Sequence, residues 1–206
     1  DGALSKVARQ TIPGAEETPF VFAYHEIVAS PPCATKSFRA DRCDVYYNGV
    51  YSPDFYAWIF PHGATTSVGT GSARKGFALR DAVAALRSVT GLAENDTIRR
   101  EGAPIPLKPL KRWDNGLDVV LAGDAAGVVA PASGEGIYYA MLGGRLAAEA
   151  VVAALTTGKA SELATARKRF MKQHGMVFWV LRMMQHFWYR NDSRRERFVT
   201  MCKDPD

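Results

Sequence analysis

The residues best suited to binding or chemistry lie between Leu121 and Gly136, in the string LAGDAAGVVAPASGEG. One carboxylate, Asp124, follows a short apolar run and can accept hydrogen bonds from sugar-like hydroxyl groups. Gly127 and the small residues around it let a phosphate or a polyol chain approach the backbone. A helix beginning near the end of this string would point its positive N-terminal end at the turn, which suits an anionic or electron-rich group. Because glycine-rich turns are common in α/β folds, the pattern alone predicts only a site for negative charge.

A second string that could form a functional site, YAWIFPHGATTSVGTG, pairs an aromatic strand with a glycine-bearing strand across a turn. Alternate residues of the first strand share one face and can form an apolar wall for a long chain such as an isoprenoid. The glycines of the second strand would leave room opposite that wall. The core face of a sheet shows the same stripe, and the pattern alone favours the core. The residues concerned are Tyr56, Trp58 and Phe60 on the first strand, Pro61, His62 and Gly63 in the turn, and Gly69 and Gly71 on the second.

Composition and charge exclude several classes of protein. Hydrophobic residues make up 47% of the chain and charged residues 23%, which is typical of a folded globular protein rather than a disordered or fibrous one. The net charge of +5 and the pI near 9.2 favour an anionic partner such as a nucleotide, a diphosphate or a phospholipid surface, and no motif supports nucleic acid. Cys33, Cys43 and Cys202 are odd in number and lack CxxC spacing, so we expect reduced thiols, with neither a disulfide framework nor a metal site.

The elements that must position these residues follow from spacing. Short aromatic or β-branched runs between Phe20 and Gly71 (FVFAYHEIV, CDVYY, FYAWIF, TTSVG) predict strands joined by turns. A helix over 77–89 follows, and then a short strand over 117–122 that leads into the glycine turn. Beyond the turn, apolar residues keep a helical period at Ile137, Met141, Ala148, Val152 and Leu155. Gly143 and Gly144 inside this helix indicate a close backbone approach, which we attribute to packing on a sheet.

The segment from 161 to 191 is basic and amphipathic, and we expect it to be helical. Lys168, Arg169 and Lys172 alternate with aromatic residues and methionines, as in a helix that lies on an anionic membrane surface. Core packing, or a lid over an apolar pocket, explains the same stripe at least as well. No stretch reaches the roughly 18 uninterrupted apolar residues of a membrane span, and no signal-peptide pattern is present, so we expect a cytoplasmic chain.

The string GDAAGVVAPASGEG resembles the second flavin-binding motif of the para-hydroxybenzoate hydroxylase-like flavoproteins, in its geranylgeranyl reductase version. The resemblance implies that Asp124 binds the ribityl chain of FAD and that the segment from Pro131 to Gly136 lies beside the isoalloxazine. Asp1-Gly2 is similar to the family's Asp-Gly motif near the flavin and the pyridine nucleotide, although a simple turn would look the same. The cofactor-binding residues implied in this way are Asp1, Gly2, Gly123, Asp124, Gly127, Pro131, Gly134, Glu135 and Gly136.

The aromatic string is similar to the substrate-binding signature of geranylgeranyl reductases: Tyr-x-Trp-x-Phe-Pro, seven residues, then Gly-x-Gly. IPLKPLKRWDNGLDVVLAGDAAG and MMQHFWYRNDSRRERFVTMCKD resemble the bacteriochlorophyll-type members. The resemblance implies an FAD enzyme, reduced by NADPH, that converts a geranylgeranyl group to phytyl by removing three of its four double bonds. The saturation of an isolated alkene also needs an acid. His62, Tyr56, Glu135 and His25 are the candidates.

The expected fold is mixed α/β, the C-terminal portion of a para-hydroxybenzoate hydroxylase-like FAD-binding fold. Its expected segments are an Asp-Gly segment at 1–15, an antiparallel substrate-binding sheet with a helix at 16–105, the returning strand, turn and helix at 106–160, and a helical region at 161–206. The family's GxGxxG fingerprint is absent, and the chain neither starts with Met nor ends like a natural tail, so we expect a fragment whose isolated form binds FAD weakly. Other hypotheses are a lipid geranylgeranyl reductase, an aromatic hydroxylase of this fold, and a non-catalytic isoprenoid or pigment carrier. Peripheral contact with a photosynthetic membrane is chemically reasonable for a lipophilic substrate.

Overall fold

The computed structural model of the protein describes residues 1–203; the last three residues of the expected 161–206 region lie outside it. The chain forms two compact units. Unit 1 comprises Asp1–Phe20 and Pro104–Met184, and unit 2 comprises Val21–Ala103 and Gln185–Asp206. Each unit therefore combines segments that are far apart in the sequence.

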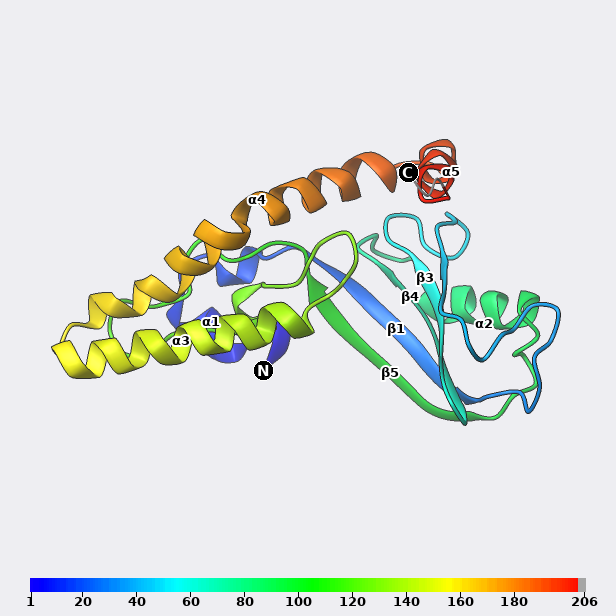
Figure 1. Ribbon diagram of the computed structural model, residues 1–206, viewed down its shortest axis with the longest axis horizontal. Coiled ribbons are helices and arrows are strands. Elements are labelled where there is room, and N and C mark those ends of the chain that lie inside the picture. Colours follow the sequence, from blue (N-terminus) through cyan, green and yellow to red (C-terminus); the bar gives the residue numbers. More distant parts are fainter. Residues whose placement is uncertain (204–206) are drawn as a thin grey trace. The chain divides into compact units, whose positions relative to one another are not determined.

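Unit 2 contains an antiparallel sheet whose strands lie in the order β2, β3, β4, β1, β5 (Figure 1). Aromatic and β-branched runs form its inner strands, as their composition predicts. The helix α2 packs against β4, and Val83 and Leu86 of this helix meet Ile59 and Val68 in a fully buried core. The bounds are β1 Phe20–Ala29, β2 Asp44–Tyr46, β3 Ala57–His62, β4 Thr65–Ser72, α2 Leu79–Val89, β5 Thr97–Pro106 and α5 Asp192–Met201.

The β3–β4 hairpin differs from the sequence expectation at its turn. His62 pairs with Thr65, so the turn consists of Gly63 and Ala64, and Pro61 still belongs to β3. Gly63 adopts a positive φ of 70°, which a two-residue hairpin turn requires and glycine accepts without strain. The prediction of a hairpin is confirmed, whereas the predicted turn at 61–63 is wrong by one to two residues.

Unit 1 is built from helices around a second core, in which Ile12, Trp113, Leu146 and Phe170 are almost wholly buried. The helix α3 and the first turns of α4 lie side by side (Figure 1) and are connected by η4. The bounds are η1 Gly2–Leu4, α1 Lys6–Thr11, η2 Ala15–Glu17, η3 Gly123–Ala126, α3 Ile137–Thr157, η4 Ala160–Ala164 and α4 Thr165–Trp188.

Two sequence expectations for the region around α3 are wrong. The predicted strand over 117–122 is only an isolated bridge between Val120 and Asp114, because no neighbouring strand of unit 1 extends it within the described residues. The helix packs against η3 rather than a sheet, and a methyl group on Gly144 would meet nothing within 4 Å. A methyl group on Gly143 would make ordinary contacts at 3.8 Å, so neither glycine is sterically required.

The apolar period that predicted α3 does not mark its buried side. Ile137, Met141 and Leu155 are each at least 73% exposed, whereas Leu146, Ala147 and Ala150 face the core. By length and composition α3 could cross a membrane, although the sequence has no uninterrupted apolar run there because Arg145 and Glu149 interrupt the helix. This is weak evidence, since a helix that packs one side into a protein core meets the same criterion.

Candidate functional site

The glycine turn of unit 1 is shaped by backbone geometry that only glycine tolerates well. Gly123, the first residue of η3, and Gly127, which follows its last residue, have φ values of 58° and 77°. A methyl group on Gly127 would lie 2.3 Å from the carbonyl oxygen of Lys108, which is closer than any side chain can come. The Gly127 amide donates to the Asp124 carbonyl at 3.0 Å and closes the turn. These contacts fix the turn against the segment that contains Lys108.

Asp124 is the one functional carboxylate that this turn presents. Its side chain is half-buried, and among the residues that the structure describes it has no hydrogen-bond or ion-pair partner. Burial raises the pKa of Asp124, and the nearby N-terminal ammonium acts in the opposite direction. A methyl group on Gly136 would lie 3.7 Å from its Oδ1, so the carboxylate faces the start of α3. An unpaired acceptor beside a glycine-lined space can bind the hydroxyl groups of a polyol.

The segment after η3 leads into α3 through a second tight turn. The Gly134 amide donates to the Ala130 carbonyl at 2.8 Å, and the Ala130 amide donates to the Glu135 carbonyl at 2.8 Å. Gly134 has a φ of 68°, while Pro131 is buried. Exposed Glu135 accepts a hydrogen bond from the Tyr138 amide at 2.9 Å, so its carboxylate caps α3. This capping role accounts for Glu135 without any role in catalysis.

The structure brings the Asp1-Gly2 segment to the glycine turn. The short helix η1, which begins at Gly2, packs against η3. Asp1 accepts a hydrogen bond from the Ser5 hydroxyl at 2.6 Å, and the same hydroxyl caps α1 by accepting from the Ala8 amide at 3.0 Å. Two of the segments that the resemblance assigned to the cofactor are thus neighbours in unit 1, although Gly2 and Gly123 lie 121 positions apart in the sequence.

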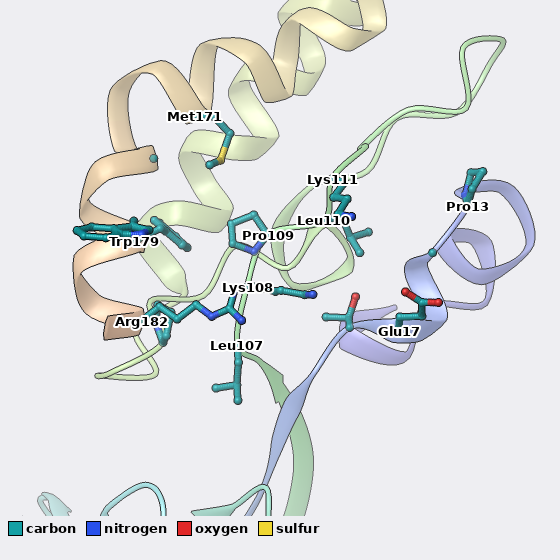
Figure 2. Close-up of a pocket in the computed structure, with 15 residues that line it drawn as sticks. Pro13, Glu17, Leu107, Lys108, Pro109, Leu110, Lys111, Met171, Trp179 and Arg182 are labelled. Carbon is teal, nitrogen blue, oxygen red and sulfur yellow. The ribbon is translucent and has the colours of Figure 1, made fainter. Parts of the chain in front are cut away.

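Unit 1 also contains a cavity of about 570 Å³ that touches this region (Figure 2). Pro131 lines it together with the loop from 107 to 111, the segment from Pro13 to Thr18 and α4. The sequence did not predict this cavity, because its walls come from four segments that are not adjacent in the chain.

The aromatic residues of β3 form a continuous row in unit 2. The rings of Tyr56 and Trp58 have centroids 5.9 Å apart, and those of Trp58 and Phe60 are stacked at 6.1 Å. Their strand neighbours Ala57 and Ile59 point to the opposite face and into the core with α2. The expectation that this stripe is the core face is therefore wrong, and the row lies on the other side of the sheet.

The glycines of β4 do not leave open space beside this row. Trp58 pairs with Gly69 across the hairpin, and a methyl group on Gly69 would lie 2.2 Å from Cζ2 of Trp58. A methyl group on Gly71 would lie 3.1 Å from Phe55. The expectation of free room at both glycines is wrong because aromatic rings cover the backbone where no side chain projects.

A hydrogen-bonded chain extends from the aromatic row across the sheet. Trp58 Nε1 donates to Ser67 Oγ at 3.0 Å, and Ser67 Oγ lies 2.9 Å from His25 Nδ1. His25 Nε2 lies 3.0 Å from Glu101, which pairs with Arg99 at 2.8 Å. The sequence named His25 but not Ser67 or Glu101, because their proximity depends on the register of β4, β1 and β5.

The other candidate acids have less suitable surroundings. His62 is exposed at the end of β3, four positions along the strand from Trp58. Burial raises the pKa of Tyr56 to about 12, so its phenol remains protonated and is a weak acid.

Cys33, Cys43 and Cys202 are exposed free thiols, and no group of three or more potential metal ligands was found among the described residues.

Comparison with known proteins places this geometry in a family, although no family model matches the chain. The geranylgeranyl diphosphate reductase of Rhodobacter capsulatus is 58% identical over 206 residues, which is 100% of this chain and 52% of that protein. The chain thus spans about half the length of this curated relative.

Two solved structures share the fold. A geranylgeranyl bacteriochlorophyll reductase-like protein from Thermoplasma acidophilum has a TM-score of 0.72 at 20% identity, covering 90% of this chain and 49% of its own. A p-nitrophenol 4-monooxygenase from Pseudomonas putida has a TM-score of 0.56 at 15% identity, covering 98% of this chain and 52% of its own. The mixed α/β, para-hydroxybenzoate hydroxylase-like fold expected from the resemblance is confirmed. By sequence along its whole length, the chain belongs to the geranylgeranyl reductase family.

Proposed function

We propose that the protein containing this chain is an FAD-dependent, NADPH-using reductase that converts a geranylgeranyl group to phytyl in (bacterio)chlorophyll biosynthesis. The observation that carries the proposal is the aromatic row of Tyr56, Trp58 and Phe60 on the sheet face away from the core. A partly exposed row of contacting aromatic rings offers continuous apolar contact to an extended polyisoprenoid chain. An aromatic substrate for hydroxylation would need only one ring-sized pocket.

The residues of unit 1 suit a flavin. Asp124 offers an unpaired carboxylate to ribityl hydroxyls, and Gly136 keeps a side chain out of the space beside it. The positive φ angles of Gly123, Gly127 and Gly134 give the cofactor loop its shape. The amino end of α3 favours negative charge on the ring. When bound, the flavin would supply the hydride for the double bond after its reduction by NADPH. In this proposal residues 1–15 and 106–160 hold the cofactor, and 16–105 bind the substrate.

The second hydrogen must come from a proton donor, and we favour His25 over His62, Tyr56 and Glu135. The His25 ring lies beside Trp58 of the aromatic row, with centroids 6.3 Å apart, and is held by Ser67 and Glu101, whereas the Tyr56 phenol is a weaker acid because burial raises its pKa. The Glu101 carboxylate, 3.0 Å from Nε2, and the Ser67 hydroxyl, 2.9 Å from Nδ1, hold the imidazole in one orientation. The chain Trp58–Ser67–His25 also fixes the indole orientation relative to the imidazole.

The deciding experiment is anaerobic turnover of the purified, flavin-loaded protein with NADPH and a geranylgeranylated substrate. We expect mass spectrometry to find three successive two-hydrogen additions and a phytyl product. Incorporation of oxygen in an aerobic control would instead support a hydroxylase. Binding of the isoprenoid without any NADPH oxidation would support a non-catalytic carrier, and exclusive turnover of an archaeal-type lipid would support a lipid reductase.

A further inference from the structure

The aromatic row of β3 continues beyond Tyr56 into the C-terminal segment of unit 2. The ring of Tyr47 lies edge-on to Tyr56, with centroids 6.1 Å apart, and meets Phe198 of α5 at 5.2 Å. Phe198 in turn contacts Trp188, the last residue of α4, at 5.8 Å. All these rings are partly exposed. The apolar surface that starts at Phe60 therefore extends from ring to ring onto α5.

A buried guanidinium fixes α5 to the loop that precedes β3. Arg195 is only 3% exposed, and it donates to the Tyr189 carbonyl at 2.7 Å and to the Pro53 carbonyl. It also pairs at 2.5 Å with Asp192, whose carboxylate accepts a hydrogen bond from the Gly49 amide at 3.1 Å. Hydrogen bonds to a charged group are among the stronger ones in proteins. The place of α5 beside the aromatic row is therefore set by the fold of unit 2.

The two ends of the row differ in their surroundings. At the α5 end, buried rings back the row: Phe55 and Tyr189 are only 1% and 4% exposed. Phe55 stacks on Tyr56 with centroids 4.2 Å apart. The Tyr189 ring lies 5.5 Å from Tyr47. At its other end β3 leads to the exposed His62. Since a polar head group loses hydration among buried rings, the α5 end suits the hydrocarbon tail of a substrate, and the His62 end suits its head.

We propose that Phe198 of α5 and Tyr47 bind the terminal isoprene unit of the substrate, so that the C-terminal helix makes the protein selective for chain length. The inference rests on the proposed function and adds a specificity determinant to it. A farnesyl group is one isoprene unit shorter than a geranylgeranyl group. Held by the same head group, it ends before these rings and buries no apolar surface against them. If α5 served only to anchor the C-terminal segment, its rings would affect stability without regard to chain length.

The test compares the geranylgeranylated and farnesylated forms of one pigment as substrates of the flavin-loaded protein that contains this chain. Phe198→Ala should raise KM for the geranylgeranylated form by about tenfold, because the aromatic contact with the chain end is lost. Its kcat, and the KM for the farnesylated form, should stay within about twofold, as expected when only binding far from the reacting bond changes. Phe198→Leu keeps part of the apolar contact and should give an intermediate KM. Val199→Ala, a half-buried neighbour on α5 outside the row, is the matched control and should change neither KM.

Calorimetry with geranylgeraniol and farnesol makes the inference separable from turnover. The wild type should bind geranylgeraniol about tenfold more tightly than farnesol, and Phe198→Ala should bind the two alcohols with similar affinity. If the wild type reduces the geranylgeranylated pigment but Phe198→Ala keeps the same KM and the same ratio of affinities, the inference is wrong and the proposed function stands. A lower melting temperature with that ratio unchanged would assign Phe198 to packing alone and likewise overturn the inference. If the wild type reduces neither pigment, the proposed function fails, and the calorimetric ratio alone decides whether α5 binds the chain end.

Discussion

The indole of Trp58 lies on the backbone of Gly69, its partner across the β3–β4 hairpin. A methyl group on Gly69 would come within 2.2 Å of Trp58 Cζ2 and 2.6 Å of His25 Cβ. Gly69 thus allows a large ring from β3 and an imidazole from β1 to meet over one residue of β4. The spacing between aromatic and glycine motifs in the sequence is explained by this contact.

Replacing Gly69 by alanine should displace Trp58 and break its hydrogen bond to Ser67. Overpacking of this kind destabilises a fold by about 1–3 kcal/mol. We expect a lower melting temperature and a higher KM for the isoprenoid, measured by thermal unfolding and steady-state kinetics. Gly144→Ala is the matched control, because a methyl group there meets nothing within 4 Å. It should stabilise α3 by about 0.5–1 kcal/mol. Equal effects of the two substitutions would refute the steric argument.

Replacing Asp124 by asparagine should weaken flavin binding without destabilising the fold. The carboxylate has no partner to lose, and burial already raises its pKa, so removing its charge should not lower the free energy of unfolding at pH 7. The measurement is flavin content after gel filtration, together with thermal unfolding of the flavin-free protein.

Asp81→Asn, an exposed carboxylate at the start of α2, is the control for a general effect of charge. It should retain flavin. Full flavin content in the Asp124→Asn protein would remove this residue from the proposed cofactor site.

Replacing His25 by glutamine should slow alkene reduction while leaving flavin reduction by NADPH intact. General acids contribute roughly 10²–10⁴-fold to rate, so a loss of at least about 100-fold is expected in single-turnover alkene reduction. His62→Gln should lose far less, since His62 is exposed at the end of β3. Stopped-flow absorbance separates the two half-reactions. The opposite ranking of the two variants would shift the donor to His62, the residue in the signature itself.

A buried ion pair holds α2 to the sheet of unit 2. Arg87 donates to Glu26 at 2.5 Å, and their side chains are only 10% and 11% exposed. Burial alone would raise the pKa of Glu26, but hydrogen bonds from Tyr24 and Arg87 and the Arg87 charge outweigh burial and hold that pKa below its ordinary value. Arg87→Met should therefore cost about 3–5 kcal/mol, because it removes the buried partner of this carboxylate and leaves only the exposed Arg100, 3.3 Å away, as a cation beside it.

The pH dependence of this pair has a definite sign. Since the folded pKa of Glu26 is depressed, its stabilisation is fully present above the unfolded pKa of about 4.3 and is lost as pH falls through the folded pKa. Unfolding by urea between pH 7 and pH 3 should show this loss in the wild type. Glu26→Gln should show a flatter profile, and an unchanged slope would contradict the assignment.

Much of the fold follows from local sequence pattern, and the elements that the sequence did not predict share a physical cause. β1 and β4 were predictable because aromatic and β-branched residues gather in short runs between turn residues. β5 was not, since Ile98 to Gly102 lie on an exposed edge and carry arginines without apolar alternation. An edge strand is specified by its partner rather than by its own hydrophobic pattern.

The candidate site also has one part that the sequence predicted and another part that it did not. Asp124 and its glycines are close in sequence, so their spacing alone predicted an anion or polyol site. The contact of Ser67 with His25 joins residues on β4 and β1 and exists only in the observed register. A shift of one residue would turn Ser67 to the core face, and no local pattern determines that register.

Exposed lysines on α4 should draw the protein to anionic membranes. Lys168 and Lys172 are exposed and unpaired within the described chain, whereas Arg169 pairs with Glu149 at 2.5 Å. Each surface lysine contributes about 1 kcal/mol of attraction, so Lys168→Gln with Lys172→Gln should reduce partitioning by about 30-fold. Co-flotation with phosphatidylserine liposomes measures this, with Lys36→Gln and Lys75→Gln combined as a control of equal charge change on loops of unit 2. Co-flotation that persists after Lys168, Arg169 and Lys172 are all replaced would exclude an electrostatic mechanism. The exposed apolar residues of α4, such as Met176, would then be the point of membrane contact.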